Sequence, residues 1–268
     1  KVEFYPSEKL LHHFIGAEKP IFSLEKIGFR KTNFQFKTPI IDRDILKTYH
    51  ETRNFPTTPT SEMSVHLRFG TISIRKLVVE ASVLNETYLK ELIWREFFMQ
   101  ILFHFPKVVH ESFKRKYDQI LWLYDEDFLQ KWQQGKTGYP IVDAGMRELN
   151  ETGFMHNRVR MVCASFFTKH LLMDWRIGEA YFAEKLMDYD LSANNGNWQW
   201  SAGTGCDSAP YFRVFNPEEQ QRKFDPDFKY IKKWVAEFGT INYPQPIVEH
   251  KFARLRALET YKKGLQDS

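Results

Sequence analysis

The sequence predicts an all-α protein with long irregular connections. From Ile72 onward, apolar residues recur at steps of three and four, which is the period of a helix that buries one face. Runs that alternate strictly between apolar and polar residues, as half-buried strands do, are nearly absent. Aromatic residues make up 16% of the 268 residues, which is enough to fill a large helical core.

The first 48 residues differ from the rest and are predicted to be an interdomain linker with one or two short helices. Pro6, Pro20 and Pro39 interrupt this segment, and the polar stretch between Gly28 and Pro39 has no clear period. Residues 49–268 are predicted to form one helical domain, in which 106–122 and 200–226 are long loops of the kind that usually bind ligands. Helices are predicted over 72–83, 87–105, 125–134, 140–151, 157–172, 178–187 and 228–236.

Composition excludes several classes of protein. The chain is 43% hydrophobic and 27% charged, with a net charge of +4, which is typical of a globular protein and not of a disordered one. No apolar run reaches about 18 residues, so we expect no membrane-spanning helix. Two cysteines are too few for a disulfide framework or an iron–sulfur cluster, and no histidine pair has the spacing of a zinc site. We therefore expect an intracellular, cytoplasmic protein without a metal.

One face of the predicted helix 87–105 carries unusual chemistry. Glu91, Trp94, Arg95 and Phe98 stand at positions i, i+3, i+4 and i+7, so that a carboxylate, an indole, a guanidinium and a phenyl ring share that face. The alternative is an ordinary Glu91–Arg95 ion pair beside a core tryptophan.

A second polar group opens the very apolar helix 157–172. Asn157, Arg158 and Arg160 precede it or lie in its first turn, and Met161 shares a face with Asn157. A helix start with arginines is a natural anion site. The alternative is simple helix capping by Asn157.

The segment 188–200 combines two carboxylates, several amides and two indoles. Asp188, Asp190, Asn194, Trp198 and Trp200 are the members of interest. On a helix Asn194 and Trp198 share a face, whereas Trp198 and Trp200 point roughly 200° apart. A capped helix with packed tryptophans is the alternative, but it leaves the amides unexplained.

A fourth, weaker signal is a run of hydroxyls that follows Tyr49 and Arg53. Hydroxyls and backbone amides in such a run suit a phosphate or diphosphate, although an N-capping loop explains them as well. The run is Thr60, Ser61, Glu62, Met63 and Ser64.

Together these motifs resemble the cryptochrome/photolyase family, and most of all its class I cyclobutane pyrimidine dimer (CPD) photolyases. The resemblance runs from about Tyr49 to the C-terminus and covers only the family's helical, flavin-binding domain, without the α/β domain that normally precedes it. The motifs that carry it are 91–98, 135–146, 155–161, 188–200, 209–217 and 243–250.

The resemblance implies a folded FAD, anionic and reduced in its active form, within the helical bundle. Arg160 would pair with Asp188 beside the flavin, and Asn194 would face flavin N5. The diphosphate segment departs from the family pattern at Pro59 and Glu62. The implied cofactor residues are Tyr49, Thr60, Ser61, Glu62, Met63, Ser64, Tyr88, Arg160, Asp188, Asp190 and Asn194.

The resemblance also implies light-dependent repair of pyrimidine dimers in single- or double-stranded DNA by a monomer. Trp198, Trp175 and Trp122 would carry electrons between the flavin and the surface. Asn194 and Glu91 would also take part in catalysis. The implied lesion and DNA contacts are Arg53, Glu91, Trp94, Arg95, Phe98, Asn157, Arg158, Met161, Trp200 and Gln220.

Three matters stay open at this point. A cryptochrome-type blue-light sensor would share the fold without repairing DNA, and a flavin-free helical nucleic-acid module is a second alternative. An antenna chromophore of the folate or deazaflavin type is expected only in the full-length protein.

Overall fold

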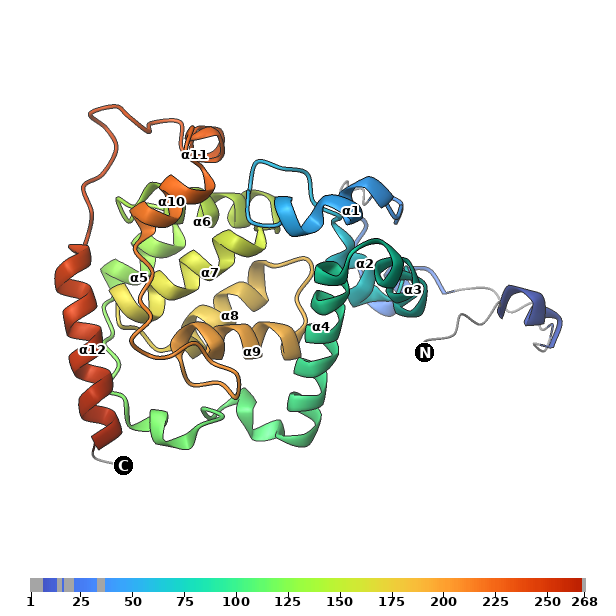
Figure 1. The fold of residues 1–268 in the computed structure, drawn as a ribbon, viewed down its shortest axis with the longest axis horizontal. Coiled ribbons are helices and arrows are strands. Elements are labelled where there is room, and N and C mark those ends of the chain that lie inside the picture. Colours follow the sequence, from blue (N-terminus) through green and yellow to red (C-terminus); the bar gives the residue numbers. More distant parts are fainter. Residues whose placement is uncertain (1–6, 14–15, 17–21, 33–36, 267–268) are drawn as a thin grey trace.

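The described residues form a helical protein without a β-sheet. The computed structural model describes residues 7–13, 16, 22–32 and 37–266, and Figure 1 shows their arrangement. The nearest approach to a strand pairing among them is an isolated bridge between Leu123 and Met173. The α-helices are α1 (Arg43–Thr52), α2 (Met63–Phe69), α3 (Ile74–Leu84), α4 (Glu86–His104), α5 (Glu126–Gln133), α6 (Pro140–Thr152), α7 (Asn157–Ser165), α8 (Trp175–Lys185), α9 (Leu191–Ala202), α10 (Pro217–Phe224), α11 (Lys229–Trp234) and α12 (His250–Gln266).

Two groups of helices enclose separate apolar clusters. The smaller cluster lies among α1–α4 and contains Leu46, Leu77 and Leu92. The larger one lies among α5–α9, α11 and the start of α12, with the fully buried Trp132 among its members. The long helix α4 begins at the side-chain cap that Asn85 provides to the N–H of Tyr88. Figure 1 shows α4 at the boundary between the two groups, where it packs against α9.

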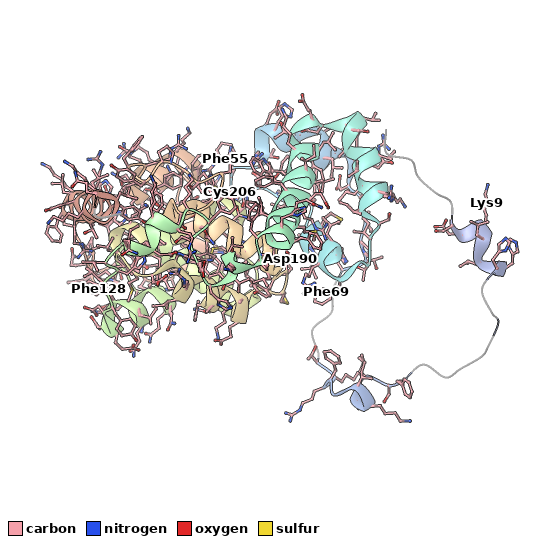
Figure 2. All side chains as sticks on the ribbon, turned by 90° about the horizontal axis from the view of Figure 1, so that it is seen from below. Lys9, Phe55, Phe69, Phe128, Asp190 and Cys206 are labelled. Atoms are coloured by element: carbon pink, nitrogen blue, oxygen red, sulfur yellow. The ribbon has the colours of Figure 1, made fainter. Side chains whose placement is uncertain are left out.

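Short 3₁₀ segments occupy much of the connecting chain. They are η1 (Ser7–His13), η2 (Glu25–Ile27), η3 (Pro106–Val109) and η4 (Arg115–Gln119), whereas η5 (Phe166–His170) is a π-helical segment. None of the residues of η1 is buried, and Figure 2 shows this segment, labelled at Lys9, apart from the helical body. The linker prediction for residues 1–48 includes ranges outside the described residues, namely 1–6, 14–15, 17–21 and 33–36. Its limit at residue 48 falls inside α1, which the side chain of Asp42 caps.

All seven predicted helices are present, but several boundaries were wrong. The helix predicted over 157–172 ends as an α-helix at Ser165 and continues as the π-helical η5. The loop predicted over 200–226 contains the end of α9 and the whole of α10. Asn216 caps α10 through its side chain, and Pro217 takes its first position. The helices α1, α2, α9, α10 and α12 were not among the predicted ranges.

No helix in the described part of the chain combines the length and the apolar character that a bilayer crossing requires.

Candidate functional site

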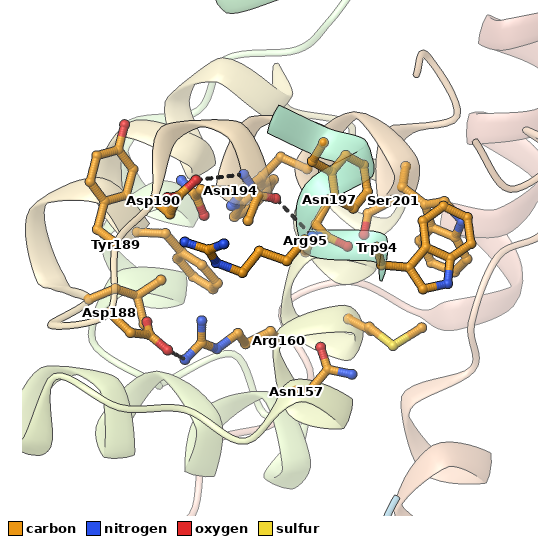
Figure 3. A pocket seen from close by; sticks show the side chains of 18 of the residues that line it. Trp94, Arg95, Asn157, Arg160, Asp188, Tyr189, Asp190, Asn194, Asn197 and Ser201 are labelled. Atoms are coloured by element: carbon orange, nitrogen blue, oxygen red, sulfur yellow. Dashed lines mark hydrogen bonds and ion pairs between the residues drawn. The ribbon is translucent and has the colours of Figure 1, made fainter. Parts of the chain in front are cut away.

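A cavity of about 420 Å³ lies between the two helical groups. Its walls come from α4, α7, α8, α9 and the connection before α9, and Figure 3 shows the polar side chains that converge on it. Its volume lies in the range of small-molecule sites. Sequence-predicted site residues make up most of its lining: Arg53, Glu91, Trp94, Arg95, Phe98, Asn157, Arg160, Met161, Asp188, Asp190, Asn194, Trp198 and Trp200.

The predicted pair of Arg160 and Asp188 is present at one wall of this cavity. Nη2 of Arg160 donates to Oδ2 of Asp188 at 2.9 Å, and Nε donates to the carbonyl oxygen of Met155 at 2.7 Å. Burial would raise the pKa of Asp188, but the charge of Arg160 and the hydrogen bonds from Arg160 and Ser64 outweigh it and lower that pKa. Asp188 is therefore ionised, and its other oxygen, Oδ1, is buried without a hydrogen-bond partner.

Asn194 is held in a fixed orientation by a residue that the sequence did not reveal. Its Nδ2 donates to the backbone oxygen of Glu179 at 3.1 Å and to Oε1 of the same residue at 2.8 Å. The amide nitrogen is thereby engaged, so that the acceptor Oδ1 is the atom left for other partners. Burial raises the pKa of Glu179. The hydrogen bonds from Asn194 and Tyr189 lower it, but by less. No sequence pattern links Glu179 to Asn194, because the contact depends on how α8 packs against α9.

Trp198 forms the apolar wall of the cavity. Its ring packs at 5.0 Å from Phe182, 5.8 Å from Phe167 and 6.2 Å from Trp132, measured between ring centroids. Helix α8 approaches it at Gly178, where a Cβ atom would lie 2.2 Å from Cη2 of Trp198. Only a glycine therefore allows α8 and this indole to pack so closely.

The cavity lining carries an ion pair between Glu91 and Arg53, where the alternative interpretation expected a pair between Glu91 and Arg95. Glu91 pairs with Arg53, the residue that follows α1, with Nη1 and Oε1 at 2.6 Å, and not with Arg95 of its own helix. Arg95 instead donates to the carbonyl oxygen of Leu67 at 3.3 Å. Burial, followed by the charge of Glu91, raises the pKa of Tyr49 to about 12, and Tyr49 lies under the Arg53 guanidinium. The interpretation of Glu91 and Arg95 as an ordinary helix pair is thus wrong.

The first half of α7 forms another part of the cavity lining. His156 caps this helix, since its Nδ1 accepts from the N–H of Arg158 at 3.1 Å, and Asn157 is therefore not the cap. Burial and the charges of Arg160, Arg158 and Arg53 lower the pKa of His156 to about 4, so the ring is neutral at pH 7. Arg158 donates to Oδ1 of Asn54 at 2.5 Å and lies 4.4 Å above the ring of Phe224 on α10.

Some amide side chains of helix α9 have structural roles in holding neighbouring segments. Asp190 caps it by accepting from the N–H groups of Ser192 and Ala193. Asn195 and Gln199 both donate to the carbonyl oxygen of Val108, at 3.0 and 2.9 Å. These two amides anchor the 3₁₀ segment η3, whereas Asn194 lines the cavity.

The predicted diphosphate segment lies next to the cavity but does not line it. Oγ of Ser61 and the hydroxyl of Tyr88 are 3.1 Å apart, and the rings of Tyr88 and Tyr49 meet edge to face at 4.9 Å. Glu62 has a left-handed φ of 51°, and its exposed carboxylate pairs with Lys37 at 3.0 Å. Thr60 is exposed and Met63 is buried in the α1–α4 cluster.

Three further predicted residues lie away from the cavity lining. Trp175 is buried, with its Nε1 unpartnered and the Arg176 guanidinium 4.8 Å from its ring. Trp122 is partly buried and meets the ring of Tyr261 at 5.7 Å. Gln220, on α10, has a buried Oε1 without a hydrogen-bond partner. Sequence reasoning missed several lining residues, including Phe182, Leu186, Tyr189, Asn197, Ser201 and Asp207.

The cavity has the chemistry that a flavin nucleotide requires. Oδ1 of Asp188 is a buried acceptor that a donor group of a bound molecule would satisfy. Oδ1 of Asn194 is a neutral acceptor, and Trp198 supplies an apolar ring surface beside it. The residues present therefore fit a cofactor that combines a flat aromatic ring with polar edges. Within the described residues no group of three or more His, Cys, Asp or Glu side chains could hold a metal.

Comparison with protein families places most of the helical domain in a known family. The family described as the FAD-binding domain of DNA photolyase matches residues 88–242. That description does not support a flavin-free module.

Individual relatives point the same way. The deoxyribodipyrimidine photo-lyase of Escherichia coli is 45% identical over 244 residues, which are 80% of this chain and 52% of that protein. The crystal structure of a class III photolyase from Agrobacterium tumefaciens has a TM-score of 0.79 at 41% identity, over 84% of this chain and 54% of that one. A Synechocystis cryptochrome has a TM-score of 0.76 at 30% identity, over 87% of this chain and 59% of that one. This chain thus spans about half the length of these relatives.

Proposed function

Because the chain belongs to the family of FAD-binding domains of DNA photolyases, we propose that it serves the light-dependent repair of cyclobutane pyrimidine dimers in DNA. A single observation carries this proposal. One continuous cavity is lined both by the residues assigned to the flavin, such as Asp188, Asn194 and Trp198, and by those assigned to the lesion, such as Glu91 and Trp200. A flavin and a flipped dimer bound there would be neighbours, as direct electron transfer requires.

The residues that would hold FAD are those on the inner wall and beside it. Arg160 would place a positive charge near the ring of a bound flavin, and its ion pair with Asp188 would limit that charge. Asn194 offers a neutral amide whose orientation Glu179 fixes. When bound, reduced and excited by light, FAD would supply the electron that opens the dimer and that returns afterwards, without net redox change. The proposed cofactor residues remain Tyr49, Thr60, Ser61, Glu62, Met63, Ser64, Tyr88, Arg160, Asp188, Asp190 and Asn194.

The outer part of the cavity would take the lesion. Photolyases are among the enzymes that take their target bases out of the helical stack. Trp94 is 40% exposed, which leaves its ring available for stacking on a flipped pyrimidine, as Trp200 would also do. Because His156 and not Asn157 caps α7, the Asn157 side chain would hydrogen-bond the base edges together with Glu91. The remaining proposed contacts to lesion and backbone are Arg53, Arg95, Phe98, Arg158, Met161 and Gln220, whose arginines would make binding dependent on salt.

Two wider aspects are part of the proposal. The protein would act as a monomer on DNA inside the cell, where the free thiols of Cys163 and Cys206 stay reduced. An antenna chromophore of the folate or deazaflavin type would bind only with the participation of a further domain in a longer protein.

The test is repair by protein whose flavin has been reduced chemically beforehand. An oligonucleotide with one thymine dimer is incubated with the protein under blue light and in the dark, and restored thymines are counted by chromatography. We expect light-dependent restoration that Trp200→Ala reduces. A flavin-loaded protein that restores none would refute the repair proposal and favour a light sensor of the cryptochrome type.

A further inference from the structure

We propose that a second electron-donating branch leaves Trp198 through Trp132 and ends at Tyr181, in parallel with the proposed branch through Trp175 and Trp122. The proposal rests on the FAD site proposed above, because an excited flavin is the oxidant that removes an electron from Trp198. It concerns how the flavin is reduced by light and is independent of the repair step.

The rings of this second branch follow one another at short range. The centroids of Trp198 and Trp132 are 6.2 Å apart, and those of Trp132 and Tyr181 are 5.6 Å apart. The three residues come from α9, α5 and α8, so the branch depends on the tertiary packing of the larger core cluster. Within the part of the chain that the structure describes, no comparable ring contact joins Trp198 to Trp175.

The surroundings of Trp132 favour it as an electron donor. Its Nε1–H donates to the carbonyl oxygen of Cys163 at 3.3 Å, and the partial negative charge of that oxygen stabilises an oxidised indole. Trp175 has the opposite surroundings, because its buried Nε1–H has no acceptor and the guanidinium of Arg176 lies 4.8 Å from its ring. Ion pairs of Arg176 with Asp118 and Asp174 offset part of that charge but leave the indole N–H unpaired.

Tyr181 brings the branch to the surface. Its ring is half-buried, and its hydroxyl donates to Oδ1 of the exposed Asn150 at 2.6 Å. Burial raises the pKa of Tyr181, so the resting phenol keeps its proton.

The final transfer balances as follows. One electron passes from Tyr181 to the oxidised Trp132, which becomes a neutral indole again and keeps its N–H proton. The phenol proton leaves past Asn150 to bulk water, and a neutral tyrosyl radical stays on Tyr181. A small external thiol then returns a hydrogen atom to that radical. The thiol itself becomes a thiyl radical. The net result is one thiol oxidised to a thiyl radical, one electron delivered to the flavin side and one proton delivered to solvent.

The test follows radicals in the FAD-loaded protein after a light pulse. Trp175→Phe interrupts the branch through Trp175 and Trp122, and we expect a tyrosyl radical still to form, detected by electron paramagnetic resonance and assigned with ring-deuterated tyrosine. Adding Trp132→Phe should lower the radical yield by at least about tenfold, because a tenfold slower electron transfer requires only a small increase in its activation barrier. Trp234→Phe is the matched control, because it alters an indole of the same cluster outside both branches.

Tyr181→Phe provides the variant least able to disturb the fold, because it removes one hydroxyl from a half-buried ring. In the Trp175→Phe background it should abolish the tyrosyl signal. Survival of that signal in Tyr181→Phe, or an unchanged radical yield after Trp132→Phe, would overturn the branch. Dimer repair by the chemically reduced Trp132→Phe and Tyr181→Phe proteins should match that of the parent protein, so a loss of repair there would count against the proposed function and not against the branch.

Discussion

Gly178 and Trp198 form a contact whose energetic consequences can be worked out from the structure. A Cβ atom at Gly178 would lie 2.2 Å from Cη2, 2.5 Å from Cζ3 and 3.0 Å from Cζ2 of the indole, all of them atoms of its six-membered ring. Overpacking of this kind costs about 1–3 kcal/mol, whereas alanine in place of glycine inside a helix gains about 0.5–1 kcal/mol. We therefore expect Gly178→Ala alone to leave stability unchanged or lower it by up to about 2.5 kcal/mol.

The effect of Gly178→Ala on stability should change sign once the Trp198 indole is replaced by a smaller ring. In a Trp198→Phe background the helix gain remains and most of the clash disappears, so Gly178→Ala should stabilise the protein. The coupling between the two changes is then about 1–3 kcal/mol, or roughly 2–12 °C in the melting temperature of a chain of this size.

The assay is a double-mutant cycle measured by thermal unfolding. Gly16→Ala serves as the control, because no heavy atom lies within 4 Å of a Cβ at that position and its φ is not in the left-handed region. Flavin retention is measured in parallel, and it should fall in Gly178→Ala, since a displaced Trp198 enters the cavity. Equal effects of Gly178→Ala in both backgrounds would refute the packing argument.

Further predictions concern the lesion, the flavin and pH. Trp200→Ala should weaken binding of dimer-containing DNA by about 5- to 150-fold, from roughly 1–3 kcal/mol of lost stacking, with little change for undamaged DNA in parallel titrations. Trp198→Phe should abolish light-driven reduction of oxidised FAD but preserve repair by chemically reduced protein, as absorption spectra and repair assays would show. Glu62 is proposed to contact FAD through its backbone alone, because its carboxylate is exposed and paired with Lys37, so Glu62→Arg should leave FAD retention during dialysis unchanged; tighter retention would place the side chain at the diphosphate. Burial, with the charges of His250 and Arg256, lowers the pKa of His170 from 6.5 to about 3, so only the unfolded chain takes up that proton in this window. The free energy of unfolding should therefore fall as the pH drops from 6.5 towards 3, and His170→Gln should flatten that dependence in thermal melts.

The helices that the sequence failed to predict have physical explanations. The buried face of α12 consists of Ala253, Ala257, Tyr261 and Gly264, which carry little apolar signal apart from the tyrosine. Its large apolar residues Phe252 and Leu255 are 58% and 57% exposed. The spacing of large apolar residues in this segment therefore points to its exposed face and not its buried face. For α10 the signals at Asn216 and Pro217 were present in the sequence, but a polar helix body concealed them.

The cavity was predictable where a motif stays within one helix. Glu91, Trp94 and Phe98 meet there because helical spacing alone places them on one face. Contacts between separate elements could not be predicted. Arg53, just after α1, pairs with Glu91, and Glu179 of α8 orients Asn194. These partners depend on how helices pack, and no spacing in the chain encodes that.

The central claim is that flavin and lesion share one cavity, and the flavin spectrum upon binding of DNA tests it most directly. A dimer-containing oligonucleotide is titrated into the FAD-loaded protein in the dark, and the absorption and fluorescence of the flavin are recorded at each step. We predict a saturable change in both that undamaged DNA does not produce and that Trp200→Ala weakens in step with its loss of affinity. Tight binding of damaged DNA without any change at the flavin would place the lesion elsewhere and contradict the account.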